Sequence, residues 1–210
     1  MNNSFVEKVF KWFSIGLFVT FAVAYLVSIT PSLVAVVYNS YIIICLLEVV
    51  LAIVLGVRIY KMSDSTAKIL YLGYTALTGL TFSSIFIVYE ITSIIWVFLA
   101  TAITFALFSF IGKRVNINLR SFGIFLLIAL LSVVILEFIN LFILSNTLDI
   151  VLCFCSLIIF VCYIAYDVNK ICRMSMGEEE KYAVIGAFDL YLDFINVFVD
   201  LLRLFGREKD

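Results

Sequence analysis

The sequence predicts an all-α membrane protein with seven transmembrane helices. Hydrophobic residues make up 65% of the 210 residues, only 14% are charged, and the mean hydropathy is +1.20. A soluble domain of this length needs a charged surface, whereas lipid itself solvates the outside of an apolar helical bundle. Membrane lipid is therefore an expected partner. The net charge of −1 argues against a nucleic-acid partner.

Seven apolar runs are long enough for a helix to cross roughly 30 Å of hydrocarbon. They cover residues 10–30, 34–58, 69–89, 91–111, 120–144, 148–172 and 182–205. Short polar segments join them, such as "KMSDSTAK" at 61–68, "GKRVNINLR" at 112–120 and "MSMGEEEK" at 174–181. The boundary at "YEITS", 89–93, carries the weakest signal. No connection is long enough for a second domain, so residues 1–210 are predicted to form one transmembrane domain.

Basic residues indicate the orientation, because cytoplasmic loops retain lysine and arginine. They occur near the N-terminus, around the second, fourth and sixth connections and near the C-terminus: Lys8, Lys11, Arg58, Lys61, Lys68, Lys113, Arg114, Arg120, Lys170, Arg173, Lys181, Arg203, Arg207 and Lys209. This alternation predicts seven crossings and a cytoplasmic N-terminus, with the basic C-terminal end as the exception. The first run exceeds the apolar core of a signal peptide, so a retained helix is expected. The Ile- and Phe-rich composition favours a bacterial inner membrane.

Histidine is absent, which removes the commonest metal ligand and the usual proton carrier near neutral pH. A rhomboid-type serine protease needs a histidine base and is excluded. Four of the five cysteines lie in the run at 148–172, where a single helix cannot close a tetrahedral metal site. We interpret them as packing residues. A response to pH is therefore expected mainly from carboxyl groups, and no cofactor is predicted.

The last run is apolar enough to cross a bilayer and yet carries a polar stripe. At helical positions i, i+4, i+7 and i+11 it holds Asp189, Asp193, Asn196 and Asp200. Arg203 and Arg207 extend this stripe to the end of the run. Each charge at mid-bilayer costs about 2.5–3.5 kcal/mol, so these side chains must face protein or water. The helix at 182–205 is therefore predicted to lie inside the bundle.

Polar residues in other runs can serve as partners of this stripe. They include Glu48, Glu137 and Asn140. Asp167 lies about two turns before the end of the run at 148–172. Arg58 is the last residue of the second run, on the same side of the membrane. Two buried carboxyl groups on consecutive helices cannot both ionise cheaply, so Asp167 and Asp193 can share one proton. For each acid taken alone, packing as a neutral or paired residue remains the alternative.

The last quarter of the chain matches a known family. "YIAYDVNKI" (163–171), followed by "GAFDLYLDFINVFVDLLRLFG" (186–206), resembles the end of the Bax inhibitor-1 family, the transmembrane Bax inhibitor motif proteins. "KMSDSTAKILYLGYTALTGLTFSSIF" (61–86) is similar to the family's second loop and third span. The resemblance covers nearly the whole chain. It implies two three-helix layers around a central C-terminal helix and, for bacterial members, a pH-sensitive calcium leak.

The resemblance also implies roles for single residues. Asp167 and Asp193 match the hydrogen-bonded pair that senses pH and gates the leak. Arg58 corresponds most nearly to the basic residue that can latch onto the first of these, and Asp189 is a departure where a small polar residue is expected. Asp193 and Asp189 are predicted to contact Ca²⁺. The predicted cation pathway comprises Asp189, Asn196, Asp200, Glu48 and Glu137.

These roles combine into an expected mechanism. In the singly protonated pair, an O–H···O⁻ hydrogen bond ties the last two helices together, and Arg58 compensates the remaining charge. When pH rises and the shared proton leaves, two anions repel each other, and the helices separate or rebind Arg58 and a cation. Calcium ions and protons are thus expected partners, with Ca²⁺ as the transported ion.

Other function classes remain open alternatives. Intramembrane aspartic proteases also carry "YD" on one helix, as in "AYD" at 165–167, but Asp193 follows "LYL" and the only proline is Pro31. An enzyme is therefore not predicted. A retinal protein needs a lysine within the last run, which has none between Lys181 and Lys209. A proton-coupled carrier or an interaction protein is the further alternative, although carriers tend to show helices broken by glycine or proline.

Overall fold

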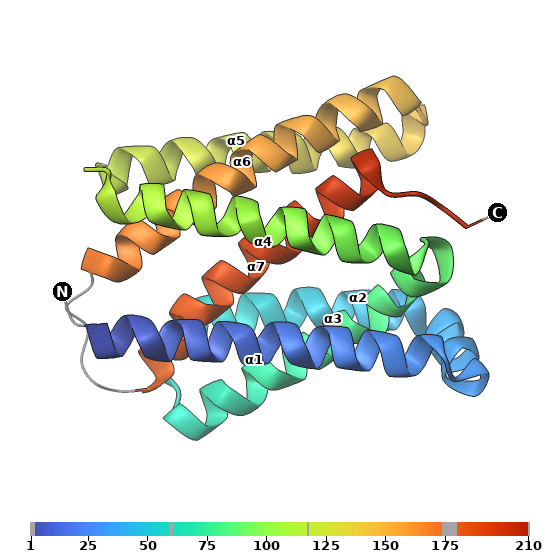
Figure 1. Ribbon diagram of the computed structural model, residues 1–210, viewed down its shortest axis with the longest axis horizontal. Coiled ribbons are helices and arrows are strands. Elements are labelled where there is room, and N and C mark those ends of the chain that lie inside the picture. The colour runs from blue at the N-terminus through green and yellow to red at the C-terminus, as the bar shows by residue number, and fades with distance from the viewer. Residues whose placement is uncertain (1–2, 59–60, 117, 174–179, 210) are drawn as a thin grey trace. The chain divides into compact units, whose positions relative to one another are not determined.

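Seven α-helices make up almost all of the structure, a computed structural model that describes residues 3–58, 61–116, 118–173 and 180–209 (Figure 1). The helices are α1 (Asn3–Ser28), α2 (Pro31–Arg58), α3 (Asp64–Val88), α4 (Ile91–Arg114), α5 (Leu119–Ile143), α6 (Asn146–Arg173) and α7 (Glu180–Phe205). Each is long and apolar enough to cross a membrane. The prediction of an all-α protein with seven membrane-length helices is confirmed.

The helices end where the sequence offers capping groups. Pro31 opens α2, at a position where its fixed φ fits and its missing N–H costs nothing. Ser63 caps α3 by accepting a hydrogen bond from the backbone N–H of Thr66 at 3.2 Å. The weakest predicted boundary, near "YEITS", is a short break between α3 and α4. Of the predicted connection at 174–181, only Glu180 and Lys181 lie within the described residues, and both belong to α7.

The chain groups into two compact units that share α7. The first comprises Met1–Ile91, Ser175–Tyr191 and Glu208–Asp210, and the second comprises Thr92–Met174 and Leu192–Arg207. The two expected sets of three helices are therefore α1–α3 and α4–α6.

In the first unit, α1 and α3 approach each other closely. A Cβ atom added at Gly79 of α3 would lie 2.7 Å from Cβ of Val23 and 2.8 Å from the carbonyl oxygen of Thr20, both on α1. Only glycine permits this spacing of the two backbones. The Tyr71 hydroxyl of α3 donates a hydrogen bond to the Trp12 carbonyl of α1 at 3.0 Å. These contacts give the first unit a fixed pairing of two helices.

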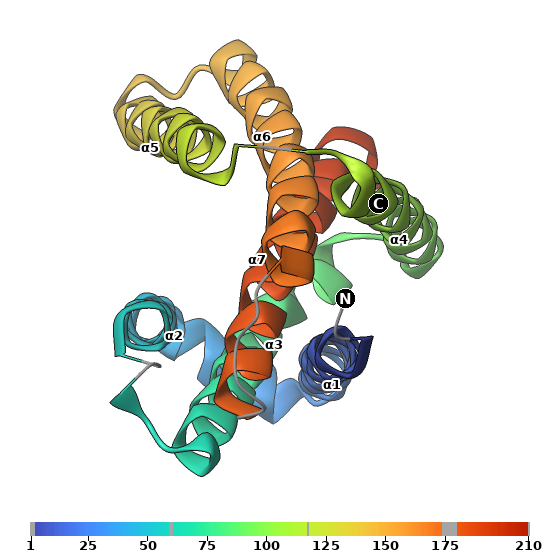
Figure 2. The same cartoon turned by 90° about the vertical axis from the view of Figure 1, so that its left-hand side faces the viewer.

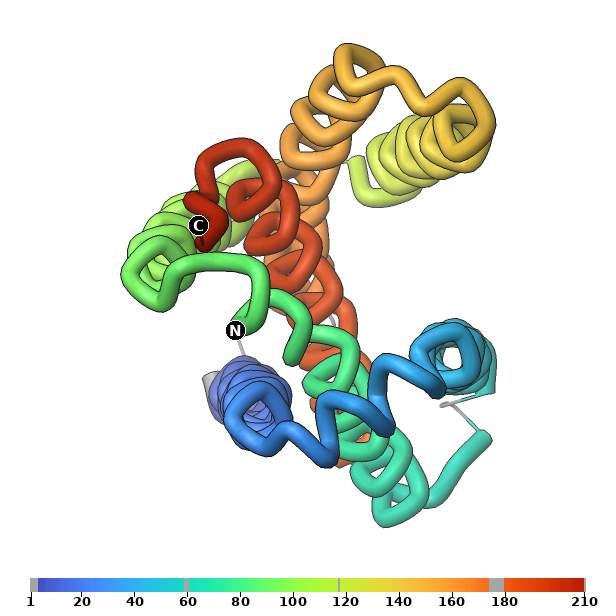
Figure 3. Tube along the Cα trace, turned by 90° about the vertical axis from the view of Figure 1, so that its right-hand side faces the viewer, coloured from blue at the N-terminus to red at the C-terminus, as the bar shows by residue number. Residues whose placement is uncertain are grey.

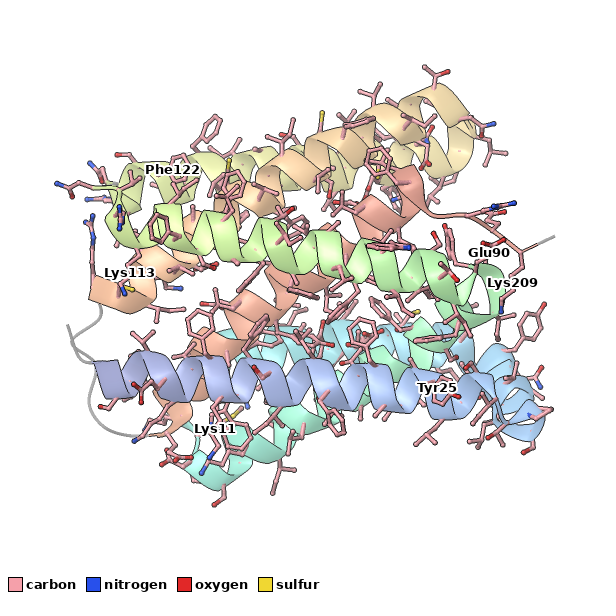
Figure 4. The ribbon with its side chains drawn as sticks, in the orientation of Figure 1. Lys11, Tyr25, Glu90, Lys113, Phe122 and Lys209 are labelled. Atoms are coloured by element: carbon pink, nitrogen blue, oxygen red, sulfur yellow. The ribbon has the colours of Figure 1, made fainter. Side chains whose placement is uncertain are left out.

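The C-terminal segment is tied to the turn between α3 and α4 (Figure 3). The backbone N–H of Lys209 donates to the Val88 carbonyl at 2.9 Å, and its Nζ donates to the Phe86 carbonyl at 2.7 Å. Glu208 forms an isolated antiparallel bridge with Tyr89. Lys209 and Glu90 accordingly lie at the same end of the first unit (Figure 4).

In the second unit, α4 and α6 touch through their backbones. A Cβ atom added at Gly112 of α4 would lie 2.8 Å from Cα of Ala165 on α6. Just beyond this contact, the Asn169 amide of α6 donates to the carbonyl oxygens of Gly112 and Val115, each at 2.6 Å. Asn169 thereby satisfies carbonyl groups that the end of α4 leaves without helical partners. The helices α5 and α6 form an antiparallel pair joined by a short loop (Figure 2).

Burial separates the inner helix from those that face lipid. In the most apolar 18-residue stretch of α7, 72% of the residues are buried, against 11% in α2 and in α5. Apolar side chains exposed along α2 and α5 suit contact with acyl chains, whereas the polar stripe of α7 needs protein around it. The inward position predicted for the last helix agrees with this burial.

Candidate functional site: the polar stripe of α7

The stripe lies on the most buried helix of the protein. Asp193 and Asp200 expose only 3% and 5% of their surface, and Asp189 and Asn196 are half-buried. The Asn196 amide donates a hydrogen bond to the Leu192 carbonyl of its own helix at 2.7 Å. Aromatic rings of Phe98 and Phe105 from α4 pack edge-on against Phe194, beside Asp193 in sequence. Both acids are therefore buried, where an ionised carboxylate is costly unless it is paired.

Asp167 of α6 is also buried and belongs to the same unit as Asp193. Its Oδ1 atom lies 3.5 Å from Nζ of Lys170, one turn further along α6. Asp167 and Asp193 both act electrostatically on the hydroxyl of Tyr163. Two carboxyl groups and a phenol thus share one neighbourhood in the second unit. A proton shared by the two acids stays a prediction.

Lys170 is a partner that sequence reasoning missed. The i,i+3 spacing of Asp167 and Lys170 within "YDVNKI" was the available signal, because residues three apart share a helix face. The predicted latch, Arg58, is the exposed last residue of α2 in the first unit. Its pairing with Asp167 stays a prediction.

Glu48 occupies the first unit. It is half-buried on α2, and its carboxyl group faces the side chains of Thr78 and Thr81 on α3. Both hydroxyl groups already donate their one hydrogen to a carbonyl group of α3, so they can only accept a hydrogen bond, from a protonated Glu48. Whether Glu48 and Asp189 contribute to a cation pathway stays a prediction.

The far end of the stripe contains a second ionic group, which joins three helices. Arg203 of α7 donates a hydrogen bond to Asp149 of α6 at 2.6 Å and lies 3.9 Å from the Glu137 carboxylate of α5. One turn back along α7, the Asp200 carboxylate accepts a weak hydrogen bond from the Cys153 thiol at 3.7 Å. The sequence placed Arg203, Asp200 and Glu137 among polar candidates but gave no sign that Asp149 joins them. An acid in the first turn of a helix is common for electrostatic reasons alone.

No group of three or more cysteine, aspartate or glutamate side chains is arranged to hold a metal ion within the described part of the chain. All five cysteines are free thiols.

Known proteins resemble the chain over its whole length. A family model described as "Inhibitor of apoptosis-promoting Bax1" matches residues 2–210. The inner membrane protein YbhL of Escherichia coli (strain K12) is 34% identical over 219 residues, covering 99% of this chain and 93% of YbhL. A protein of Borreliella burgdorferi is 33% identical over 100% of this chain and 94% of its own length. A protein of Deinococcus radiodurans is also 33% identical, over 99% and 92% of the two chains.

Proposed function

The chain belongs to the Bax inhibitor-1 family, and on that basis we propose that this multi-pass membrane protein is a pH-sensitive calcium leak channel gated by Asp167 and Asp193. One observation carries the proposal. Two carboxyl groups are buried in membrane-length helices of one unit, at 6% and 3% exposure, and both act on the same phenol. Ionisable side chains inside a membrane are costly, and they are by default candidates for an ion or proton pathway.

The closed state is the singly protonated pair. The protonated acid donates a hydrogen bond to the carboxylate of the other, and this charge-assisted hydrogen bond holds α6 against α7. Lys170, 3.5 Å from Asp167, offsets the single remaining negative charge. In this proposal, Arg58 pairs with Asp167 once the hydrogen bond between Asp167 and Asp193 is lost.

The open state follows loss of the shared proton. Two carboxylates at close range repel each other, so α6 and α7 lose the bond between them as pH rises. Cations then pass along the stripe of α7, where Asp193, Asn196 and Asp200 follow one another at one-turn intervals. Asp189 extends the same face by one turn and serves, with Asp193, as the proposed Ca²⁺ contact.

Orientation and membrane are part of the same proposal. The alternation of basic loops supports a cytoplasmic N-terminus. YbhL is named as an inner membrane protein, which supports a bacterial inner membrane for this chain. The pair then lies toward the cytoplasmic end of α6, and the Arg203 group lies toward the outside.

The test is calcium flux into liposomes between pH 5 and pH 8. Purified full-length chain is reconstituted with an internal calcium dye, and the wild type is compared with Asp167→Asn, Asp193→Asn and the exposed-site control Glu7→Gln. We expect the control to keep the wild-type pH profile and each pair variant to lose its dependence on pH, because an amide cannot release the shared proton. Thermal unfolding in detergent checks that each variant is folded.

Three outcomes contradict the proposal. An unchanged pH profile in both pair variants rejects the proton-sharing pair. Loss of stability without any change in flux assigns the acids to packing. Strict stoichiometric coupling of calcium to proton movement identifies a carrier and overturns the channel.

A further inference from the structure

Four basic side chains gather at one end of the second unit, where α4 and α6 end and α5 begins (Figure 2). They are Lys113 and Arg114 in the last turn of α4, Arg120 in the first turn of α5 and Arg173 in the last turn of α6. All four are exposed, and Figure 4 shows Lys113 in this position. These four residues form the basic end of the unit. Under the proposed orientation, the basic end faces the cytoplasm.

Within the described residues of the second unit, no solvent-exposed acid accompanies the basic end. Its two partly exposed acids, Glu137 and Asp149, pair with Arg203 at the opposite end of α5 and α6. Its buried acids are Asp167, Asp193 and Asp200. Lys170 lies 3.5 Å from Asp167 and is therefore left out of the basic end. The basic end is thus a surface of one charge sign, which attracts anions.

The basic end also has a defined geometry. Basic residues at cytoplasmic helix ends set membrane topology, a role that needs no fixed side-chain positions. Here the Arg114 guanidinium lies 4.0 Å from the centre of the Phe110 ring, one turn back along α4. Arg173 donates hydrogen bonds to the Val115 carbonyl at 3.3 Å and to the Asn116 side chain at 2.8 Å, which fastens the loop after α4 to the end of α6. Cations positioned in advance lose less freedom when an anion binds.

Exposed apolar side chains adjoin the basic end on its membrane side. Phe110, one turn before Arg114, is 53% exposed. Ile124 and Phe125, about one turn after Arg120, are 52% and 62% exposed. Such side chains suit contact with acyl chains, and basic side chains at the edge of the hydrocarbon lie at the depth of lipid headgroups. One phospholipid molecule can therefore meet both surfaces, with its phosphate at the basic end and its acyl chains on the apolar side chains.

We propose that the basic end binds the headgroup of an anionic phospholipid in the adjoining leaflet. Guanidinium groups bind phosphate oxygens through paired N–H···O hydrogen bonds, and basic clusters beside membrane helices attract anionic lipids. A zwitterionic phospholipid carries the same phosphate, but its own ammonium group offsets the negative charge. Free phosphate lacks acyl chains for Phe110, Ile124 and Phe125 to contact. The inference is independent of the proposed calcium leak.

The test measures lipid binding by the purified full-length chain in a non-ionic detergent. The probes are phosphatidylglycerol, which is anionic, and phosphatidylcholine, which is zwitterionic, each labelled on an acyl chain. Arg114→Gln/Arg120→Gln removes two positive charges from the basic end, and the control Lys11→Gln/Lys61→Gln removes two from exposed sites in the first unit. We expect the wild type to prefer phosphatidylglycerol. The first variant should lose on the order of tenfold in affinity for it, whereas the control should stay within about twofold of the wild type.

Three results would overturn the lipid site. Equal losses of affinity in the variant and the control would reduce the effect to net charge. Equal affinities of the wild type for the two lipids would show that the headgroup is not recognised. Displacement of the lipid by inorganic phosphate at constant ionic strength would assign the cations to a free anion. If thermal unfolding shows that the double variant is not folded, Lys113→Gln replaces it and should weaken phosphatidylglycerol binding by about threefold.

Discussion

The side-chain oxygens of Thr20 and Tyr191 lie 2.6 Å apart in the buried centre of the first unit. The Thr20 hydroxyl has one hydrogen, and it donates this hydrogen to the Thr75 carbonyl at 2.8 Å. Tyr191 is therefore the donor in the contact with Thr20. The hydrogen-bonded chain from Tyr191 through Thr20 to Thr75 links α7, α1 and α3.

The first prediction removes this donor. Tyr191→Phe keeps the ring, which packs edge-on against Tyr71 and Tyr74, and deletes only the hydroxyl. We expect a loss of about 1 kcal/mol in stability, because one buried hydrogen bond disappears. Thermal unfolding in detergent should show Tm lower by roughly 2–4 °C. Tyr38→Phe, at a residue 82% exposed, is the control and should leave Tm unchanged. Equal Tm values for both variants would refute the assignment.

The second prediction concerns the backbone contact of α4 with α6. Gly112→Ala adds a methyl group within 3 Å of Ala165 backbone atoms, which cannot turn aside. We expect a loss of about 1–3 kcal/mol, the usual cost of overpacking. Gly73→Ala is the matched control, since a Cβ there meets nothing within 4 Å, and it should raise stability by roughly 0.5–1 kcal/mol. The same sign of change in both variants would contradict the close approach.

The third prediction concerns the start of α7. The carboxyl oxygens of Asp64, in the first turn of α3, accept hydrogen bonds from the backbone N–H groups of Glu180 and Lys181 at 3.2 and 3.1 Å. Asp64→Ala leaves these helix-terminal donors without their acceptor, so we expect a loss of roughly 1–2 kcal/mol. Asp64→Asn keeps one acceptor oxygen and should lose about half as much. A wild-type unfolding temperature for Asp64→Ala would show that water replaces the cap at no cost.

The fourth prediction tests the charge next to the gating pair. Lys170→Met removes the ammonium group 3.5 Å from Asp167 and thereby disfavours loss of the shared proton. The pH of half-maximal calcium flux should rise by about 0.5–1 unit, a modest shift because Lys170 is partly exposed to solvent. Lys170→Arg keeps the charge and should retain the wild-type midpoint. A midpoint that falls, or stays fixed, in Lys170→Met rules out this electrostatic role.

Much of the fold follows from the chain alone. The length of each apolar run sets the number of helices, because a membrane span must satisfy its own backbone hydrogen bonds. The spacing of Asp193 and Asp200 predicts that both share one face of the last helix, and the structure buries both. Helical periodicity gives the face on which a residue lies, but it does not identify the neighbour that the face meets.

The apolar runs and the spacing of the polar residues were enough to predict the seven helices, their breaks and the inward face of α7. Three contacts could be found only in the folded protein: Asp64 caps a helix 116 residues further along, Asp149 pairs with Arg203, and Gly112 touches Ala165. The two groups of features differ in the range of the interactions that produce them. Backbone hydrogen bonding and transfer into lipid act within one segment and leave a periodic trace, whereas these three contacts depend on how separate helices rotate and approach one another during packing.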